Sequence, residues 1–358
     1  MKFKIFFLYL ILSNSVVYSD SSIRVYGNND FYLSSEPIGL TGVNKQWRSG
    51  SFYGGTFQIA NLHNELGINY SNKFKISTGY QQEYNLGFSS DTADYYYGTQ
   101  NKGLLPNKKY TIDLKAEAYR AKTWKASKVF DVKQGQVSIG IKVLEASGLQ
   151  YGSIKGISTS NNSGKSDQYQ AKILYYYDND RLLGRPDVVA PNGRGYAIDI
   201  ETKLPINEKL SLNANLRDLA GYIKWQNVPF TEADLISGTK VIDNDGFIKH
   251  LPHLSGKIGY QQKLKQKLKP KIDINIDYQL KNKNYSIISQ YKHNTYEDLV
   301  SIGFAKKSNY SKKSMSLWPQ TKSVDFGFQY KKTFVGLGLQ HFDLDKNRTV
   351  HINVGYNF

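Results

Sequence analysis

The chain has 358 residues, no cysteine and a formal net charge of +17, with 47 lysines and arginines against 30 aspartates and glutamates. The lack of cysteine excludes a disulfide framework and a cysteine-type metal site. This length suits two ordinary domains or one large all-β domain, and the positive charge favours anionic partners such as phosphates, acidic polysaccharides or anionic solutes.

The first twenty residues have the pattern of a secretory signal peptide. Two lysines precede an apolar run over residues 5–12, and Val17 and Ser19 occupy the positions before a cleavage point that we expect at Asp20. The apolar run is too short to cross a membrane as a helix, because that requires about 20 apolar residues. We therefore expect residues 1–19 to be removed on export.

Residues 20–50 leave three expectations open: a periplasmic arm, an interior plug or a first strand.

From residue 51 to residue 358, short runs alternate between apolar and polar residues, and no convincing helical stripe occurs. A period of two is that of a β-strand, whereas a helix repeats about every 3.6 residues. The clearest runs are YTIDLKAEA (110–118), VSIGIKV (137–143), YAIDIET (196–202), LSLNANL (210–216), KIDINIDYQL (271–280), VDFGFQY (324–330) and FVGLGLQHF (334–342).

The two rows of these runs favour a barrel in lipid over a soluble sandwich. The apolar rows are clean and carry aromatic residues near strand ends, which suits an outer band with aromatic girdles. The polar rows mix small, amide and charged residues, which suits a polar lumen. The barrel must be closed, since an open edge in lipid leaves unpaired backbone groups at a cost of several kcal/mol each. The candidate lumen-lining residues are Asp113, Lys115, Glu117, Lys142, Asp199, Glu201, Asp273, Asn275, Asp277, Asp325, Gln329 and Gln340.

The sequence ends in TVHINVGYNF, a strictly alternating strand that finishes on phenylalanine. Together with the signal peptide and alternating strands of about ten residues, this tail resembles the outer-membrane β-barrel proteins of Gram-negative bacteria. In that family the tail is the signal read by the barrel-assembly machinery. The resemblance implies an assembly signal at Ile352, Val354, Tyr356 and Phe358. Long-chain fatty-acid transporters have a similar size, but their signature near the mature N-terminus is not found.

The number of strands follows from counting the runs. Residues 254–358 hold seven strands, and residues 51–228 hold nine to eleven, with RDLAG (217–221) taken as a short connection. Single-chain bacterial barrels have an even number of strands. We therefore predict an all-β, transmembrane, antiparallel up-and-down β-barrel of about 16 strands, with 14 or 18 as alternatives. Long loops rich in Asp, Asn, Gly and Pro are expected at 178–193 and 229–253.

Two groups of side chains raise the question of chemistry. His250 and His253 are three apart, but Pro252 prevents the helix on which they would share a metal. His253 and Ser255 share a strand face, which leaves an outer-membrane lipase or protease open as a second alternative. No P-loop, GxSxG or dinucleotide fingerprint occurs. We expect no catalytic, metal or cofactor site.

Lysines are concentrated in KLKQKLKPK, which predicts either a solvated turn or a basic rim that attracts anions. The rim candidates are Lys263, Lys265, Lys267 and Lys269. A second group is proposed to bind lipopolysaccharide phosphates by charge-assisted hydrogen bonds: Lys306, Lys307, Lys312 and Lys313.

These patterns together predict an integral barrel of the Gram-negative outer membrane with porin- or transporter-like passage of solutes through a polar lumen. The alternative is a structural, adhesive or assembly-related barrel with a plugged lumen. The expected partners are outer-membrane lipid, lipopolysaccharide, the barrel-assembly machinery and small anionic or hydrophobic solutes. Nucleic acid is not expected, because the positive charge comes with no recognisable binding module.

Overall fold

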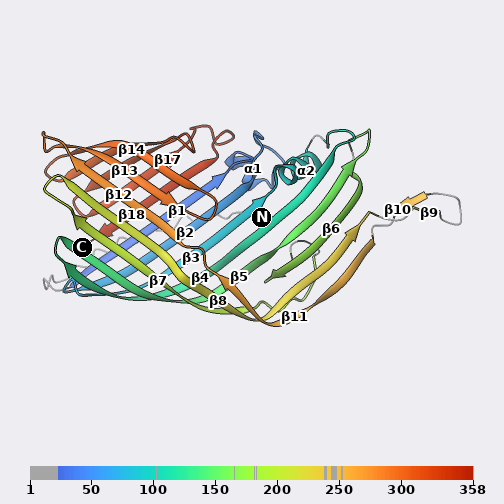
Figure 1. The fold of residues 1–358 in the computed structure, drawn as a ribbon, viewed down its shortest axis with the longest axis horizontal. Helices are drawn as coiled ribbons and strands as arrows, with labels where there is room; N and C mark the ends of the chain where they lie inside the picture. Colours follow the sequence, from blue (N-terminus) through green and yellow to red (C-terminus); the bar gives the residue numbers. More distant parts are fainter. Residues whose placement is uncertain are drawn as a thin grey trace.

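The computed structural model describes residues 23–357 apart from positions 102, 165, 181, 183, 238–239, 243–247 and 251–252. The expected signal peptide and Phe358 lie outside these residues. Sixteen of the described strands form one antiparallel sheet, and β9 and β10 pair separately (Figure 1). The elements are β1 (Ile23–Ser35), α1 (Leu40–Asn44), β2 (Phe57–Tyr70), β3 (Phe74–Phe88), α2 (Ser90–Gln100), β4 (Lys109–Val132), β5 (Gly135–Ser160), β6 (Ser166–Tyr177), β7 (Asn192–Pro205), β8 (Leu210–Ile236), β9 (Lys240–Ile242), β10 (Ile248–His250), β11 (His253–Lys267), β12 (Lys271–Gln279), β13 (Tyr285–His293), β14 (Asp298–Lys307), β15 (Ser311–Trp318), β16 (Ser323–Tyr330), β17 (Thr333–Leu339) and β18 (Thr349–Asn357).

Fourteen of the described strands close into a barrel. The ring runs β1, β2, β3, β4, β5, β7, β8, β12, then β13 to β18 in order, and β18 pairs with β1 to close it. The prediction of an antiparallel closed barrel is confirmed. The prediction of about 16 strands is wrong, and the smaller alternative of 14 is the number in the ring.

The number of strands in the ring is smaller than predicted because β6 lies end to end with β7 and β11 lies end to end with β12. β5 has 26 residues and β8 has 27, so each is long enough to pair with two strands along one edge. Between them, β7 pairs near one end and β6 near the other. β11 likewise continues the line of β12 along the second edge of β8. In Figure 1 these strands extend to the right of the ring, and β9 and β10 project beyond them.

β8 is long because two segments expected to be irregular are part of it. RDLAG is no connection, since the strand passes through it with left-handed backbone at Asp218 and Ala220. The expected loop at 229–253 is also wrong for residues 229–236, which pair with β6 and β11. A bulge absorbs turn-forming residues without ending a strand. The expected loop at 178–193 corresponds to the connection between β6 and β7.

The two ends of the barrel differ in their connections. We call the end with the tight turns the short-turn end; its turns are residues 71–73, 133–134, 206–209, 280–284, 308–310 and 331–332. The opposite end, called the long-connection end, holds residues 36–56, 89–108 and 340–348, whereas residues 178–191 connect β6 to β7 part-way along β5 and β8. α1 and α2 lie together at that end (Figure 1). No helix among the described residues has the length and apolar character needed to cross a membrane.

α2 was not visible in the sequence because it has no apolar stripe. The helix begins after Ser89, whose side-chain oxygen accepts a hydrogen bond from the backbone N–H of Thr92 at 3.1 Å. Such a cap satisfies one of the free N–H groups of the first turn. Aromatic contacts then hold the helix: the rings of Phe52 and Tyr97 are stacked with their centres 4.3 Å apart. Tertiary packing of this kind overrides a weak local pattern.

The outer wall carries the apolar row of each strand. In β14, Val300, Ile302 and Phe304 are exposed, with 60% of Ile302 accessible, whereas Leu299, Ser301 and Ala305 on the alternate row are buried. The inward row is the buried one because it meets side chains from other parts of the ring. This arrangement suits a bilayer outside and a polar interior inside.

Candidate functional site: the barrel interior

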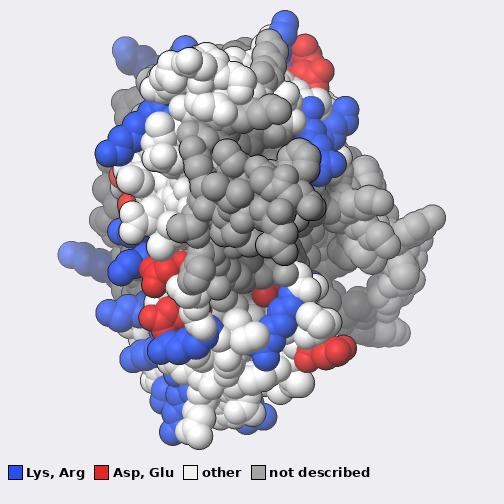
Figure 2. Space-filling view, turned by 90° about the vertical axis from the view of Figure 1, so that its right-hand side faces the viewer, with Lys and Arg blue, Asp and Glu red and all other residues white. Residues whose placement is uncertain are grey.

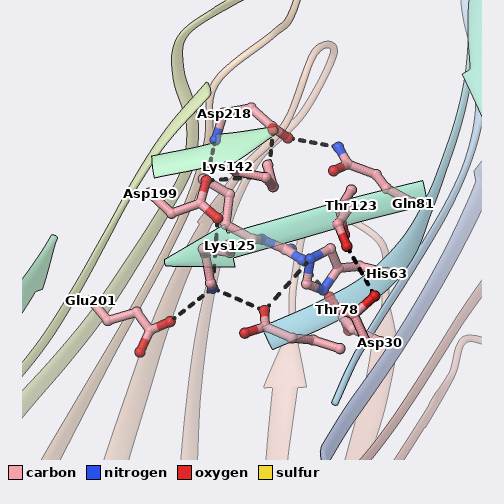
Figure 3. Close-up of polar contacts among 12 residues, drawn as sticks. Asp30, His63, Thr78, Gln81, Thr123, Lys125, Lys142, Asp199, Glu201 and Asp218 are labelled. Carbon is pink, nitrogen blue, oxygen red and sulfur yellow. Dashed lines mark hydrogen bonds and ion pairs between the residues drawn. The ribbon is translucent and has the colours of Figure 1, made fainter. Parts of the chain in front are cut away.

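A connected set of charged side chains occupies the barrel interior near the short-turn end. Lys125 of β4 lies at its centre, and its Nζ is 2.9 Å from Glu65 Oε2 and 3.3 Å from Glu201 Oε1. Lys75 of β3 contacts the same Glu201 at 2.6 Å. Alternation places all these residues on the inward row of β2, β3, β4 and β7. Opposite charges therefore neutralise each other across the four gaps between β2 and β7, and Figure 3 shows the contact of Lys125 with Glu201.

A second layer follows toward the long-connection end. The Nζ of Lys142 is 2.7 Å from Asp218 Oδ1 and 3.2 Å from Asp199 Oδ1, and only 2% of each of the three side chains is accessible. Lys125 is 3.7 Å from Asp199, which joins the two layers. Buried charges of this kind are tolerated only when they are paired and hydrogen-bonded. We call Glu65, Lys75, Lys125, Lys142, Asp199, Glu201 and Asp218 the interior ion-pair network.

Further contacts cross the lumen from one side of the ring to the other. Arg217 Nη2 is 3.2 Å from Asp30 Oδ2. Their strands, β8 and β1, are separated by β2, β3, β4, β5 and β7 along the shorter way round the ring. Gln81 Nε2 of β3 donates to Asp218 Oδ2 at 2.8 Å. These contacts therefore bridge the barrel interior at this level.

A histidine extends the crossing contacts to the far side of the ring. In β18, His351 Nε2 lies 3.0 Å from Asp30 Oδ1, and its Nδ1 lies 3.2 Å from Asp325 Oδ2 in β16. Asp30 therefore contacts both Arg217 and His351. Each of the two nitrogens of the His351 imidazole ring therefore contacts one carboxylate. This part of the interior is a charged chain from β8 through β1 and β18 to β16.

An apolar cluster adjoins the charged layers. Along β5, Leu144 and Ala146 follow Lys142 on the inward row, and they belong to a cluster with the fully buried Ile223 and Trp225 of β8. The indole N–H of Trp225 donates to Gln266 Oε1 at 3.0 Å, so its one polar group is satisfied. The inner face of β4, β5, β7 and β8 thus carries a charged layer on the short-turn side and an apolar layer on the other.

The short-turn end opens into a cavity of about 570 Å³, which we call the vestibule. Arg24, Lys75, Lys203 and Lys332 line it with positive charge, and Glu201 contributes the one carboxylate among the described lining residues. Lys75 and Glu201 also belong to the interior ion-pair network. The vestibule therefore leads directly to the charged layer that closes the lumen.

The structure brings together only some of the residues predicted to line the lumen. Lys142, Asp199 and Glu201 belong to the interior ion-pair network, and Asp325 contacts His351. Glu117 is buried and pairs with Lys115 at 2.7 Å. The remaining candidates make contacts elsewhere: Asp113 with Lys155, Asp273 with Asn275, Asp277 with Lys312, Gln329 with the Lys331 carbonyl oxygen, and Gln340 with the Arg348 backbone N–H.

The other predicted positions lie as follows. Lys263, Lys265 and Lys267 are on the exposed side of β11, part-way along the wall rather than at a mouth, and Lys269 lies 4.0 Å from Glu117. Ile352, Val354 and Tyr356 lie on β18 at the closing pair with β1. The side chains of His250 and His253 lie outside the described residues. No group of three or more metal-ligating side chains occurs among the described residues.

Sequence reasoning missed several residues that close the lumen. Arg217 and Asp218 were assigned to a short connection. Asp30 lies in residues 20–50, for which three alternative structures were expected. Gln81 does stand on an alternating run, and that signal alone places it inside, whereas the row opposite Lys125 mixes Lys122, Trp124, Ala126 and Lys128 and gives no such signal. Which strands face each other across the lumen depends on the order of the ring, and this order is not a local property of the sequence.

Comparison with known proteins gives only distant likenesses. No protein-family model and no curated protein matches the chain. Among solved structures, the Pseudomonas putida toluene transporter TodX aligns with a TM-score of 0.43 at 9% identity, covering 95% of this chain and 89% of that one. The CymD monoaromatic hydrocarbon channel aligns with a TM-score of 0.25 at 7% identity, covering 94% and 87%. Likenesses of this degree identify no substrate for this chain.

Proposed function

We propose that the chain is an integral β-barrel of the outer membrane of a Gram-negative bacterium and that it passes small solutes through a lumen with a side-chain gate. One observation carries the proposal: buried and part-buried side chains meet across the interior of a closed ring whose outer wall is apolar. An apolar wall suits lipid, and polar side chains suit a solute pathway.

The gate consists of side chains in the described part of the chain. Side-chain rotation is much faster than domain motion, so the lumen can open without unfolding an element. Opening still has a cost, because separating a buried ion pair leaves uncompensated charges worth about 3–5 kcal/mol. A solute that supplies a replacement charge avoids part of that cost.

The vestibule favours small anionic solutes. A carboxylate or phosphate that enters it meets Lys75, whose partner is Glu201 at 2.6 Å. The anion can replace Glu201 at this lysine, so Lys75 stays paired while the gate rearranges. A neutral or hydrophobic solute offers no such exchange. Passage would then follow the solute gradient.

Conductance in planar lipid bilayers tests this function. We expect the wild-type barrel to stay closed for most of the time. The double variant Gln81→Ala, Arg217→Ala removes two lumen-crossing side chains and should give a steady, higher conductance. Under a salt gradient across the bilayer, the reversal potential should have the sign expected of a channel that prefers anions.

The matched control is Thr78→Ala, Lys128→Ala, because both residues are exposed on the outer row of the same wall. This variant should conduct as the wild type does. Heat-modifiable migration on gels would establish that each variant is folded. A wide, steady wild-type conductance would contradict the gate, and cation preference in the open variant would contradict the anionic solute.

The plugged barrel with a structural, adhesive or assembly role is the second candidate. The apolar cluster around Trp225 favours it, because a dry layer beside the charged one obstructs a polar solute. If the folded double variant stays silent, this candidate replaces transport. Both candidates share the expected export signal at residues 1–19 and the assembly role of Ile352, Val354, Tyr356 and Phe358.

A further inference from the structure

An uninterrupted line of charged side chains crosses the outside of the barrel wall. Lys122 of β4 pairs in register with Glu145 of β5, Glu145 with Arg194 of β7, Arg194 with Lys224 of β8, and Lys224 with Lys265 of β11. All five side chains are exposed. We call these five residues the basic row. Its four basic residues and one acid make it strongly positive.

The basic row lies on the outer face of the wall. Its members alternate with buried inward residues: Glu145 stands between Leu144 and Ala146, and Lys224 stands between Ile223 and Trp225. Among the described residues, no carboxylate oxygen lies within 4.0 Å of a basic nitrogen of the row. These charges are therefore available to a partner outside the protein. Figure 2 shows lysine and arginine side chains projecting along one flank of the molecule, with fewer acidic ones between them.

An aromatic and apolar row runs directly beside the basic row, on its short-turn side. Trp124, Val143, Tyr196 and Tyr222 are paired in register across the same strands. Further along β5 toward the short-turn end, only apolar residues face outward, and 63% of Ile141 is accessible. Aromatic side chains at the edge of an apolar band mark the membrane–water interface. The basic row therefore lies at the level of lipid headgroups.

The surface between the two rows is hollowed. A cavity of about 600 Å³ is lined by Glu145, Arg194, Tyr196, Tyr222 and Lys224, among others. Lys265 Nζ lies 4.3 Å from the centre of the ring of Tyr222, which lines the cavity, so a third cation of the row lies beside it. Arginine and lysine in such a recess suit a phosphate group, because each offers charge-assisted hydrogen bonds.

We propose that the basic row binds the phosphate groups of a phosphorylated glycolipid in the outer leaflet. The inference rests on the proposed function for the membrane, and the long-connection end is taken to face outward because barrels of this kind have short periplasmic turns and longer extracellular loops. A phosphate monoester carries more negative charge than the diester of a phospholipid, so it suits four clustered cations better. The site differs from the lysines expected to contact lipopolysaccharide, since the turn holding Lys306, Lys307, Lys312 and Lys313 is at the short-turn end.

Lipid titration of the folded protein in neutral detergent, read by native mass spectrometry, tests the proposal. The probe is diphosphoryl lipid A, with phosphatidylglycerol and inorganic phosphate as separate arms. The fourfold variant Lys122→Gln, Arg194→Gln, Lys224→Gln, Lys265→Gln should bind lipid A at least about tenfold more weakly, since each cation near a membrane surface contributes about 1 kcal/mol. Phosphatidylglycerol should bind the wild type more weakly than lipid A, and inorganic phosphate should not compete.

The matched control removes four exposed lysines at the short-turn end: Lys133→Gln, Lys209→Gln, Lys281→Gln, Lys283→Gln. It should bind lipid A as the wild type does. Equal loss in both variants, or no loss in the basic-row variant, would overturn the proposal, as would equal affinity for phosphatidylglycerol. Glu145→Gln alone should tighten binding, which keeps the test decisive if the fourfold variant misfolds. Failure to enter any detergent micelle or bilayer would instead refute the membrane barrel itself.

Discussion

At the scale of single residues, Glu297 illustrates how the protein accommodates a carboxylate that pairs with no cation in the described part of the chain. It lies in the connection between β13 and β14, where Tyr32 and Ser34 of β1 each donate a hydrogen bond to it at 2.8 Å and Asn294 Nδ2 donates at 3.0 Å. Burial raises the pKa of this carboxyl, and the three hydrogen bonds offset only part of that effect. Glu297 therefore binds its proton more tightly in the folded state than in the unfolded state.

The raised pKa of Glu297 predicts a pH dependence of stability. The folded state binds more protons at this site, so its contribution is complete at low pH and is lost as pH rises through the folded pKa. Glu297→Gln removes the titration. We expect the free energy of unfolding of the wild type, minus that of the variant, to fall from acidic pH toward neutrality. Urea unfolding in detergent across this range measures the difference; a flat or rising difference would contradict the assignment.

At the scale of elements, the segment of β5 around Gly148, which we call the joint, determines how β6 and β7 share one edge of β5. β5 pairs with β7 up to Ala146 and with β6 from Gln150 onward. Gly148 lies between these parts with φ +69, and a β-carbon there would come within 2.4 Å of Arg120 Nε. Glycine adopts this conformation without steric cost. The residue thus permits the change of partner along a single continuous strand.

Gly148→Ala should destabilise the barrel by about 1–3 kcal/mol, because alanine is strained at positive φ and its methyl group displaces the Arg120 side chain. Gly27→Ala is the matched control: Gly27 also lies in a strand, and the nearest atom to an added β-carbon is 3.7 Å away. The control should shift the urea midpoint of unfolding little. Equal shifts in the two variants would mean that the joint has no special requirement.

The same elements explain what the sequence could and could not predict. Alternation in β12, β16 and β17 is local, so their existence and their outward rows followed directly from the residues. The joint in β5 and the bulge at Asp218 in β8 are set by neighbouring strands, so counting runs gave too many members of the ring. The contact of Arg217 with Asp30 could not be predicted, because it depends on the diameter and order of the closed ring.

At the scale of the whole molecule, the exposed apolar wall determines the solvent in which the protein is stable. Monomeric soluble proteins rarely expose contiguous apolar patches larger than a few hundred Å². Here Ile302, Phe304, Leu317 and Phe326 are each at least half accessible on neighbouring strands. A bilayer or detergent has to cover them.

We therefore expect residues 20–358 to aggregate in plain buffer and to fold in detergent micelles or lipid vesicles. Light scattering and heat-modifiable migration after refolding, with and without detergent, measure this directly. A monodisperse, folded monomer without detergent would mean that the wall faces water and that the barrel is not a membrane protein.

The seam between β1 and β18 sets a condition on biogenesis. Tyr26 pairs with Asn357, so the earliest described strand receives its second neighbour from the latest one. During synthesis β1 can pair with β2 at once, but its other edge stays unpaired until the ribosome has synthesised β18. A helper that shields this waiting edge, and so delays premature pairing of β1 with a foreign strand, would favour correct closure of a polypeptide joined in this way.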